Sequence, residues 1–245
     1  MVALEKLDAE RILRTSERLE RRIGERFPSS GLRRVAGQLV ELASRAKATT
    51  AWIARPNAGL RVASVVVVGA MLVSVALLVV NSVRASKAEG PLGLGELVQI
   101  SEATMNGIVL LGAAVWFFVS FETRFKRGRV LKALQGLRTL AHLIDVHQLT
   151  KDPDVIDGAA LRTASSPKHD LTPFQMGRYL DYCTEMLSLT AKIAALYSEG
   201  FDDPDALDAV TDLEGLTNAL QHKIWQKIVL LESRAGLAGA VTAPP

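Results

Sequence analysis

The sequence predicts an all-α membrane protein, in which a two-helix transmembrane hairpin is joined to a cytoplasmic helical bundle. The hairpin is predicted by two apolar runs, residues 60–83 and 103–121, because residues 62–83 and 103–121 contain no charged side chain. As a helix, the first uncharged run is about 33 Å long at ~1.5 Å per residue, enough to cross a hydrocarbon core of ~30 Å. The bundle is predicted by apolar residues that recur at helical spacing through the rest of the chain.

The alternative is that both runs are buried helices of a soluble core. A soluble helix normally keeps a polar stripe, and residues 65–69 and 75–80 leave room for none. Each helix would need protein on every side, which is a large demand on a chain of 245 residues. The first run is also far too long for an ordinary β-strand. We therefore expect both runs to span a bilayer.

Basic residues crowd one side of the two predicted spans. The connecting segment, residues 84–102, contains only Arg84 and Lys87 as basic residues and is rich in turn-forming Gly and Pro. The positive-inside rule then predicts a double-pass protein of the inner (plasma) membrane, with residues 84–102 external and both termini cytoplasmic. We define the basic collar as Arg55, Arg61, Arg124, Lys126, Arg127 and Arg129. It either attracts anionic lipid headgroups or is only a topology signal, and both interpretations remain open.

The overall composition agrees with a membrane location. The chain is 49% hydrophobic and its net charge is +3, but the basic residues lie beside the apolar runs and aromatic residues make up only 5%. Membrane topology therefore explains the charge better than nucleic-acid binding does. The one cysteine excludes an intramolecular disulfide framework and fits a reducing compartment. The charged N-terminal segment predicts that the first span, rather than a signal peptide, directs insertion.

Residues 1–59 are predicted to form a cytoplasmic helical hairpin. The first helix covers about residues 4–27, and its apolar stripe comprises Ala9, Ile12, Ser16, Leu19, Ile23 and Phe27. A break at residues 28–31 separates it from a second helix that ends near residue 54, whose coiled-coil-like seam comprises Leu32, Val35, Leu39, Leu42, Ala46, Thr49 and Ile53. Residues 55–59, which contain Arg55, Pro56, Asn57 and Gly59, are predicted to be a hinge before the first span.

Small and polar residues stand out within residues 60–121, the predicted transmembrane hairpin. Small residues four apart, which let helices approach closely in lipid, are Ala70 with Ser74 and Ala103 with Gly107. Asn81 and Asn106 are the amides within the spans, and we expect them to hydrogen-bond across the hairpin or across an oligomer. Neither is ionisable, which favours packing over a proton or ion pathway.

Residues 122–234 are predicted to form a cytoplasmic helical bundle. The second span is expected to continue without a break to about residue 148, with Val130, Leu134, Leu137, Ala141 and Ile144 as its seam and Leu131, Leu140 and Leu143 beside it. After a loop at residues 151–171, Thr172 and Pro173 begin a helix that packs through Phe174, Leu180, Cys183, Leu187, Ile193, Ala194 and Tyr197. Asp203 and Pro204 begin the last helix, whose seam comprises Val210, Leu213, Thr217, Leu220, Ile224, Ile228 and Leu231; residues 235–245 are expected to be disordered.

No catalytic residue, cofactor site or metal site is predicted. His142, Asp145 and His147, with Asp152 and Asp154 behind them, contain ligand types for a metal, but their spacing matches no metal motif. A polar patch that caps the helix end is the more ordinary interpretation. Cys183 lies among apolar residues at helical spacing and is interpreted as a small core residue rather than a nucleophile.

The function predicted from these observations is that of a membrane-anchored, non-catalytic helical scaffold or interaction protein. Its expected partners are membrane lipid and either another protein or copies of itself; neither nucleic acid nor a small-molecule substrate is predicted. The alternative is a subunit of an oligomeric channel or transporter, in which Asn81 and Asn106 face water. An enzyme acting at the membrane surface near His142 is disfavoured, because no nucleophile, base and orienting group can be named together.

Overall fold

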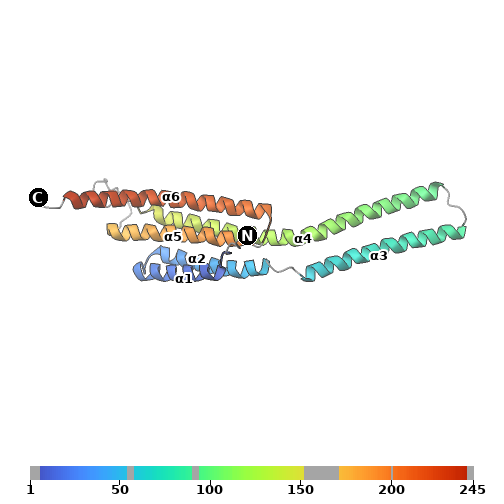
Figure 1. Cartoon of the computed structure of the whole chain (residues 1–245), viewed down its shortest axis with the longest axis horizontal. Helices are drawn as coiled ribbons and strands as arrows, with labels where there is room; N and C mark the ends of the chain where they lie inside the picture. Colours follow the sequence, from blue (N-terminus) through green and yellow to red (C-terminus); the bar gives the residue numbers. More distant parts are fainter. Residues whose placement is uncertain (1–5, 54–57, 90–93, 152–170, 200, 242–245) are drawn as a thin grey trace, which may run out of the picture. The chain divides into compact units, whose positions relative to one another are not determined.

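The computed structural model describes residues 6–53, 58–89, 94–151, 171–199 and 201–241 (Figure 1). Within these ranges every regular element is an α-helix and no strand occurs, which confirms the all-α fold class. The helices are α1 (Ala9–Arg26), α2 (Gly31–Ile53), α3 (Ala58–Glu89), α4 (Leu94–Leu149), α5 (Pro173–Ser198) and α6 (Pro204–Val241). Most of the loop predicted at residues 151–171 lies outside the described residues, as do Arg55, Pro56 and Asn57 of the predicted hinge.

Contacts divide the chain into two units. The bundle unit contains Met1–Ala54 and Arg129–Pro245, and the apolar unit contains Arg55–Gly128. The N-terminal helical pair and the C-terminal bundle fall in the same unit. The helix α4 runs unbroken from Leu94 to Leu149, as predicted for the second span and its continuation.

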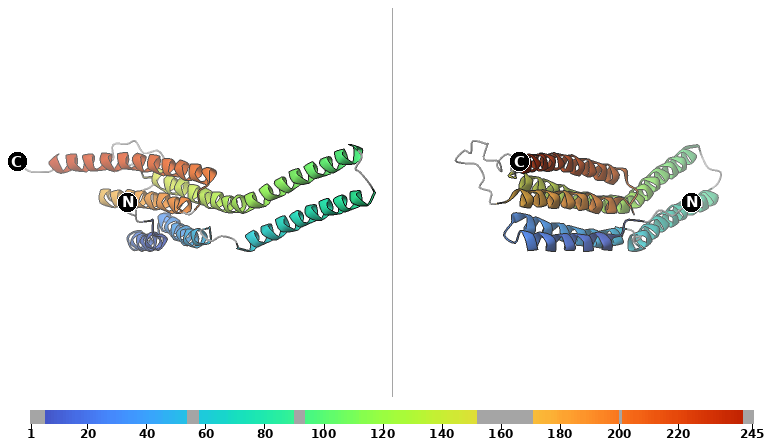
Figure 2. Two further views of the ribbon diagram at one scale, coloured as in Figure 1. Left: turned by 45° about the vertical axis from the view of Figure 1, so that its right-hand side comes forward. Right: turned by 60° about the vertical axis from the view of Figure 1, so that its left-hand side comes forward.

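The helix α5 is the central contact element of the bundle unit, because it packs against α1, α2 and α6 (Figure 2). The stripe predicted on the first helix faces this core: Ile12, Ser16, Leu19, Ile23 and Phe27 are all buried. The Asp8 carboxylate begins α1 by accepting the Glu10 N–H at 2.9 Å. Phe27, directly after α1, packs edge-on against the rings of Tyr179 and Tyr182 of α5.

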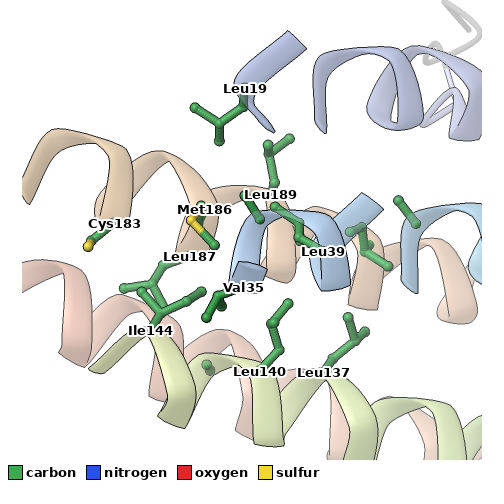
Figure 3. Packing of buried hydrophobic residues seen from close by; sticks show 14 of the residues in the cluster. Leu19, Val35, Leu39, Leu137, Leu140, Ile144, Cys183, Met186, Leu187 and Leu189 are labelled. Carbon is green, nitrogen blue, oxygen red and sulfur yellow. The ribbon is translucent and has the colours of Figure 1, made fainter. Parts of the chain in front are cut away.

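The predicted seams of α2, the C-terminal part of α4, α5 and α6 meet in one hydrophobic core. Figure 3 shows Val35 and Leu39 of α2, Leu137, Leu140 and Ile144 of α4, and Met186 and Leu187 of α5 clustered together, with Cys183 of α5 at the edge of the group. The prediction that Phe174 packs in this core is wrong, because its side chain is 68% exposed near the start of α5. Leu143, predicted to widen the seam of α4, is also exposed.

Both predicted helix starts in the C-terminal half are present. The Thr172 hydroxyl accepts the Gln175 N–H at 3.2 Å, and the Gln175 side chain accepts the Thr172 N–H at 2.9 Å, which together make a capping box. Asp203 is buried, and its carboxylate accepts the Ala206 N–H at 3.1 Å in the first turn of α6. The last helix continues to Val241, into the segment for which we predicted disorder.

The apolar unit contains α3 and the N-terminal part of α4. Helix covers residues 84–89 and 94–102 of the predicted connecting loop, and residues 90–93 lie outside the described part of the chain. By length and composition, one described helical segment, Thr104–Leu149, is long and apolar enough to cross a membrane, and none of its most apolar stretch is buried. The apolar stretch Val65–Asn81 on α3 is shorter.

Candidate functional site

Aromatic side chains gather on α4 where the predicted span ends. Trp116, Phe117, Phe121 and Phe125 are all exposed, and the rings of Phe117 and Phe121 lie 6.0 Å apart. The Arg124 guanidinium lies over the Trp116 ring, 5.4 Å from its centroid. A cation on the face of an indole combines a charged group with a large apolar surface, which is the chemistry of a membrane–water interface.

The residues of the basic collar fall in both units. Arg124, Lys126 and Arg127 lie on α4 within the apolar unit, and Arg61 lies near the start of α3. Lys126 forms an ion pair with Glu122 at 2.9 Å, one helical turn earlier. Arg129 belongs to the bundle unit, where its guanidinium lies 4.7 Å from the centroid of the Trp52 ring. Arg55 lies outside the described residues, so a single collar stays a prediction.

The small residues of the two apolar helices border one groove. Ala70 and Ser74 of α3 and Gly107 of α4 line a groove of about 410 Å³. A Cβ atom added at Gly107 would lie 3.9 Å from Val75 of α3, so the helices are close at this point. The Ser74 hydroxyl donates to the Ala70 carbonyl at 2.9 Å, which satisfies it within its own helix. The amides of Asn81 and Asn106 are exposed, and their hydrogen bonding across the hairpin stays a prediction.

The three side chains considered as metal ligands, His142, Asp145 and His147, have separate surroundings. Asp145 accepts a hydrogen bond from Gln148 Nε2 at 2.5 Å and forms an ion pair with Lys223 at 3.5 Å, whereas His142 is exposed. His147 packs on Gly31 at the start of α2, and burial is the main reason that its pKa lies below the ordinary value. In the described ranges no three His, Cys, Asp or Glu side chains gather where they could hold a metal ion. Asp152 and Asp154 lie outside those ranges.

The polar cluster at the end of α4 includes Lys227 of α6, which the sequence did not place there. The Lys227 ammonium of α6 donates to the carbonyls of Gln148 and Lys151, at 3.1 and 3.3 Å. It thereby caps the C-terminal end of α4, where a positive charge also interacts favourably with the helix dipole. The Lys151 ammonium lies over the Tyr179 ring, 5.2 Å from its centroid. The sequence carries no signal for this contact, because Lys227 and Gln148 are far apart in the chain.

Cys183 lies next to this cluster, and its environment makes it chemically inert. The side chain is fully buried, and burial raises the pKa of the thiol to about 12. The thiolate is the nucleophilic form of cysteine, and almost no Cys183 is in the thiolate form near neutral pH. This agrees with its interpretation as a core residue.

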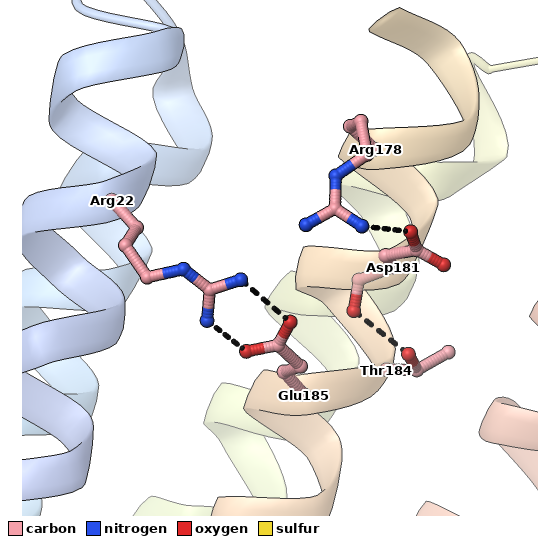
Figure 4. A network of polar contacts seen from close by, with 5 residues as sticks. All are labelled: Arg22, Arg178, Asp181, Thr184 and Glu185. Atoms are coloured by element: carbon pink, nitrogen blue, oxygen red, sulfur yellow. Dashed lines mark hydrogen bonds and ion pairs between the residues drawn. The ribbon is translucent and has the colours of Figure 1, made fainter. Parts of the chain in front are cut away.

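The helices α1 and α5 are joined at two places. The Arg22 guanidinium donates to both carboxylate oxygens of Glu185, at 2.7 and 3.3 Å (Figure 4), and it also lies over the Tyr182 ring. Toward the other end, the Leu7 N–H donates to Glu199 at 2.8 Å. A cleft of about 650 Å³ lies along these two helices, and no pattern in the sequence predicts it.

The comparisons add no relative to this description: no protein-family model, no curated protein and no solved structure matches the chain.

Proposed function

We propose that the protein is a membrane-anchored, non-catalytic helical scaffold, in which the apolar unit is the anchor and the bundle unit presents surfaces to a protein partner or to a second copy. The observation that carries this proposal is the exposed apolar surface of α3 and of the N-terminal part of α4. The proposed location is the inner membrane, with both termini in the cytoplasm.

The amount of exposed apolar surface is the first support. The exposed large side chains of the apolar unit are Val62, Val65, Val66, Leu72, Val73, Leu77, Val79, Val80, Val83, Val98, Met105, Ile108, Val109, Leu110, Trp116, Phe117, Phe121 and Phe125. Moving one such side chain from water to an apolar medium is worth about 1.5–3 kcal/mol when it becomes fully buried. Soluble monomers rarely leave a continuous apolar surface of this extent in water. We propose hydrocarbon as the cover that the chain does not itself provide.

The position of the aromatic residues is the second support. Trp116 and Arg124 lie at the end of the apolar stretch of α4 that precedes the basic residues. Tryptophan favours the headgroup level of a bilayer, where its ring is in apolar surroundings and its N–H is hydrated. Arg124 on the ring face then lies within reach of lipid phosphates.

The scaffold role rests on the bundle unit. Its exposed apolar side chains include Val146 and Leu149 of α4 and Trp225, Val229 and Leu230 of α6. Exposed Trp and aliphatic residues are the types that anchor protein interfaces. Photocrosslinkers placed at Val146 and at Trp225 in cells should each yield an adduct with a protein or with a second copy. Absence of adducts, together with a monomeric purified protein, would contradict the scaffold role.

A channel or transport subunit is the second candidate, and one observation favours it. The Asn106 amide is exposed on α4 with Met105, Ile108 and Val109 exposed near it, so it is available to a neighbouring hairpin or to a water-filled pore. Conductance in planar bilayers that changes when Asn106→Leu is introduced would favour the pore. If no conductance is measured even at high protein concentration in the bilayer, packing between copies is favoured.

Tryptophan quenching tests the anchor. Two variants keep one exposed tryptophan each: Trp52→Phe with Trp225→Phe keeps Trp116, and Trp52→Phe with Trp116→Phe keeps Trp225. Trp116 and Trp225 are similarly exposed, 64% and 57%, so they form a matched pair. In brominated phosphatidylcholine vesicles we expect quenching of Trp116 and little quenching of Trp225, with the reverse for aqueous iodide. Equal quenching of both by iodide and of neither by brominated lipid would contradict a membrane anchor.

A further inference from the structure

The cleft between α1 and α5 has a shape set by the two contacts that close its ends. The Leu7 N–H donates to Glu199 toward one end, and Arg22 donates to Glu185 toward the other; Leu7 and Glu185 both line the cleft. The walls come from the first half of α1, from α5 and from Gln221 of α6, and they enclose about 650 Å³. This volume falls within the ~300–1,000 Å³ of small-molecule sites in proteins.

The floor of the cleft is apolar. Ile12 and Leu189 line it and are 6% and 7% exposed, and Leu7 adds apolar surface at one end. Hydroxyl groups of Thr15, Thr184 and Ser188 also line the walls. An apolar floor with a few polar groups around it is the usual construction of a site that orients a small ligand.

The charge around this floor is positive. Lys6, Arg11 and Lys192 line the cleft, and among the ion pairs formed by the described residues none includes any of these three. Both carboxylates of the cleft are already engaged: Asp8 caps α1, and Glu185 is neutralised by Arg22. The Asp8 carboxylate keeps its charge, so the cleft holds three cations, Lys6, Arg11 and Lys192, against one carboxylate that no cation of the described residues neutralises. Lysines exposed on a helix surface do not by themselves indicate a binding site. Here, however, Arg11 of α1 and Lys192 of α5 line the same apolar floor.

We propose that this cleft binds a small soluble amphiphilic anion, whose apolar body lies on Leu7, Ile12 and Leu189 and whose phosphate or carboxylate is held by Arg11 and Lys192. The scaffold function does not require such a ligand. Arg11 supplies a planar guanidinium suited to two oxygens of the anion, and Lys192 supplies a point charge from the facing helix. Its ammonium already donates to Ser188 at 2.7 Å, which places it at the wall of the cleft.

Protection from alkylation tests this site in the full chain. The variant Ser188→Cys, in phosphatidylcholine nanodiscs, places a thiol in the wall, whereas the native Cys183 is buried and serves as an unreactive background. The probe is 1-naphthyl phosphate, which combines an apolar ring with an anionic head. We expect a saturable slowing of N-ethylmaleimide labelling by about tenfold once the site is filled, since occupancy above ~90% excludes the reagent. Thr15→Cys provides a second reporter on the opposite wall. No protection at either thiol would overturn the proposal.

Two sets of controls separate the amphiphilic anion from simpler explanations. The neutral 1-naphthalenemethanol and inorganic phosphate each keep one half of the probe and should bind at least about tenfold more weakly, the loss expected for one charge-assisted contact. Arg11→Gln and Lys192→Gln should each weaken protection about tenfold, whereas Arg14→Gln, on α1 outside the cleft, should not change it. Equal protection by the neutral compound, or equal loss with Arg14→Gln, would overturn the assignment of an anion.

Two further arms identify the source of the anion. Nanodiscs with half of their lipid replaced by phosphatidylglycerol should leave labelling unchanged when no probe is added; protection by that lipid alone would replace the soluble ligand with a headgroup. A chain lacking residues 2–5 should bind the probe as the full chain does. Protection seen only after that deletion would mean that the N-terminus of the chain competes for the cleft, and it would overturn the proposal.

Discussion

At the scale of single residues, the close approach of His147 to Gly31 has a measurable consequence. A Cβ atom added at Gly31 would lie 2.4 Å from His147 Cε1, which is too close for contact without movement. At an unstrained helix position, Gly→Ala normally stabilises a protein by about 0.4–1 kcal/mol. Here we expect Gly31→Ala to lose this stabilisation, because moving the His147 ring off its rotamer costs about 0.5–1.5 kcal/mol. In a His147→Ala background the same change should stabilise the bundle, and chemical denaturation of the four variants measures the coupling. Equal effects in both backgrounds would contradict this contact.

His147 also predicts how stability changes with pH. Burial, and then the positive charges of Lys151 and Arg34, lower its pKa below the ordinary value of 6.5. The unfolded chain therefore takes up a proton more readily than the folded chain does, so stability rises with pH between the lowered pKa and 6.5. We expect the native bundle to lose stability as the pH falls through 6.5 toward the lowered pKa of His147, and His147→Gln to remove part of that loss. His222→Gln, on an exposed part of α6, is the control for removing an imidazole, and an equal effect of both variants would contradict the assignment to His147.

At the scale of elements, the sequence predicts what lies within one helix and not which helices meet. The stripe of α1 and the cap formed by Thr172 and Gln175 were predictable, because residues three or four apart share a helix face. The contact of Lys227 with the end of α4 and the cleft between α1 and α5 join residues far apart in the chain. No periodicity encodes such pairings, since they depend on which of several similar apolar stripes pack together.

The contact between α1 and α5 predicts a specific local opening. Arg22 and Glu185 are 40% and 38% exposed, so solvent reduces the strength of their two-point ion pair to about 0.5–1 kcal/mol. Arg22→Met keeps the apolar stem and should speed amide hydrogen exchange in Ala9–Arg26 about twofold to fivefold. Arg178→Met is the control, because Arg178 also lies over the Tyr182 ring but pairs with Asp181 within α5. A comparable increase in α1 for both variants would show that the ring, rather than the ion pair, holds the two helices.

At the scale of the whole molecule, the two units differ in where their apolar side chains lie. The bundle unit buries its apolar stripes against one another, as Leu39 of α2 and Leu187 of α5 do. The apolar unit has too few polar residues to form stripes and leaves Val65 and Leu77 of α3 and Leu110 of α4 exposed. Its long uncharged runs were evident in the sequence, yet the residues themselves do not distinguish lipid from a protein partner as their cover. The medium around the apolar unit is therefore the property that most needs measurement.

Two valines of α4 make that measurement possible, because they differ in unit but hardly in exposure. Val109 is 65% exposed in the apolar unit and Val146 is 58% exposed in the bundle unit. In water, replacing either exposed valine by aspartate changes stability by about 0.5 kcal/mol or less. In a bilayer, aspartate near the centre of a span costs about 2.5–3.5 kcal/mol of insertion free energy. We therefore expect Val109→Asp to move a large share of the chain from the carbonate-resistant membrane fraction to the soluble or degraded fraction, and Val146→Asp to leave the distribution unchanged. If Val109→Asp behaved like Val146→Asp, the exposed face of α4 would not lie in lipid, and a protein partner would have to cover it.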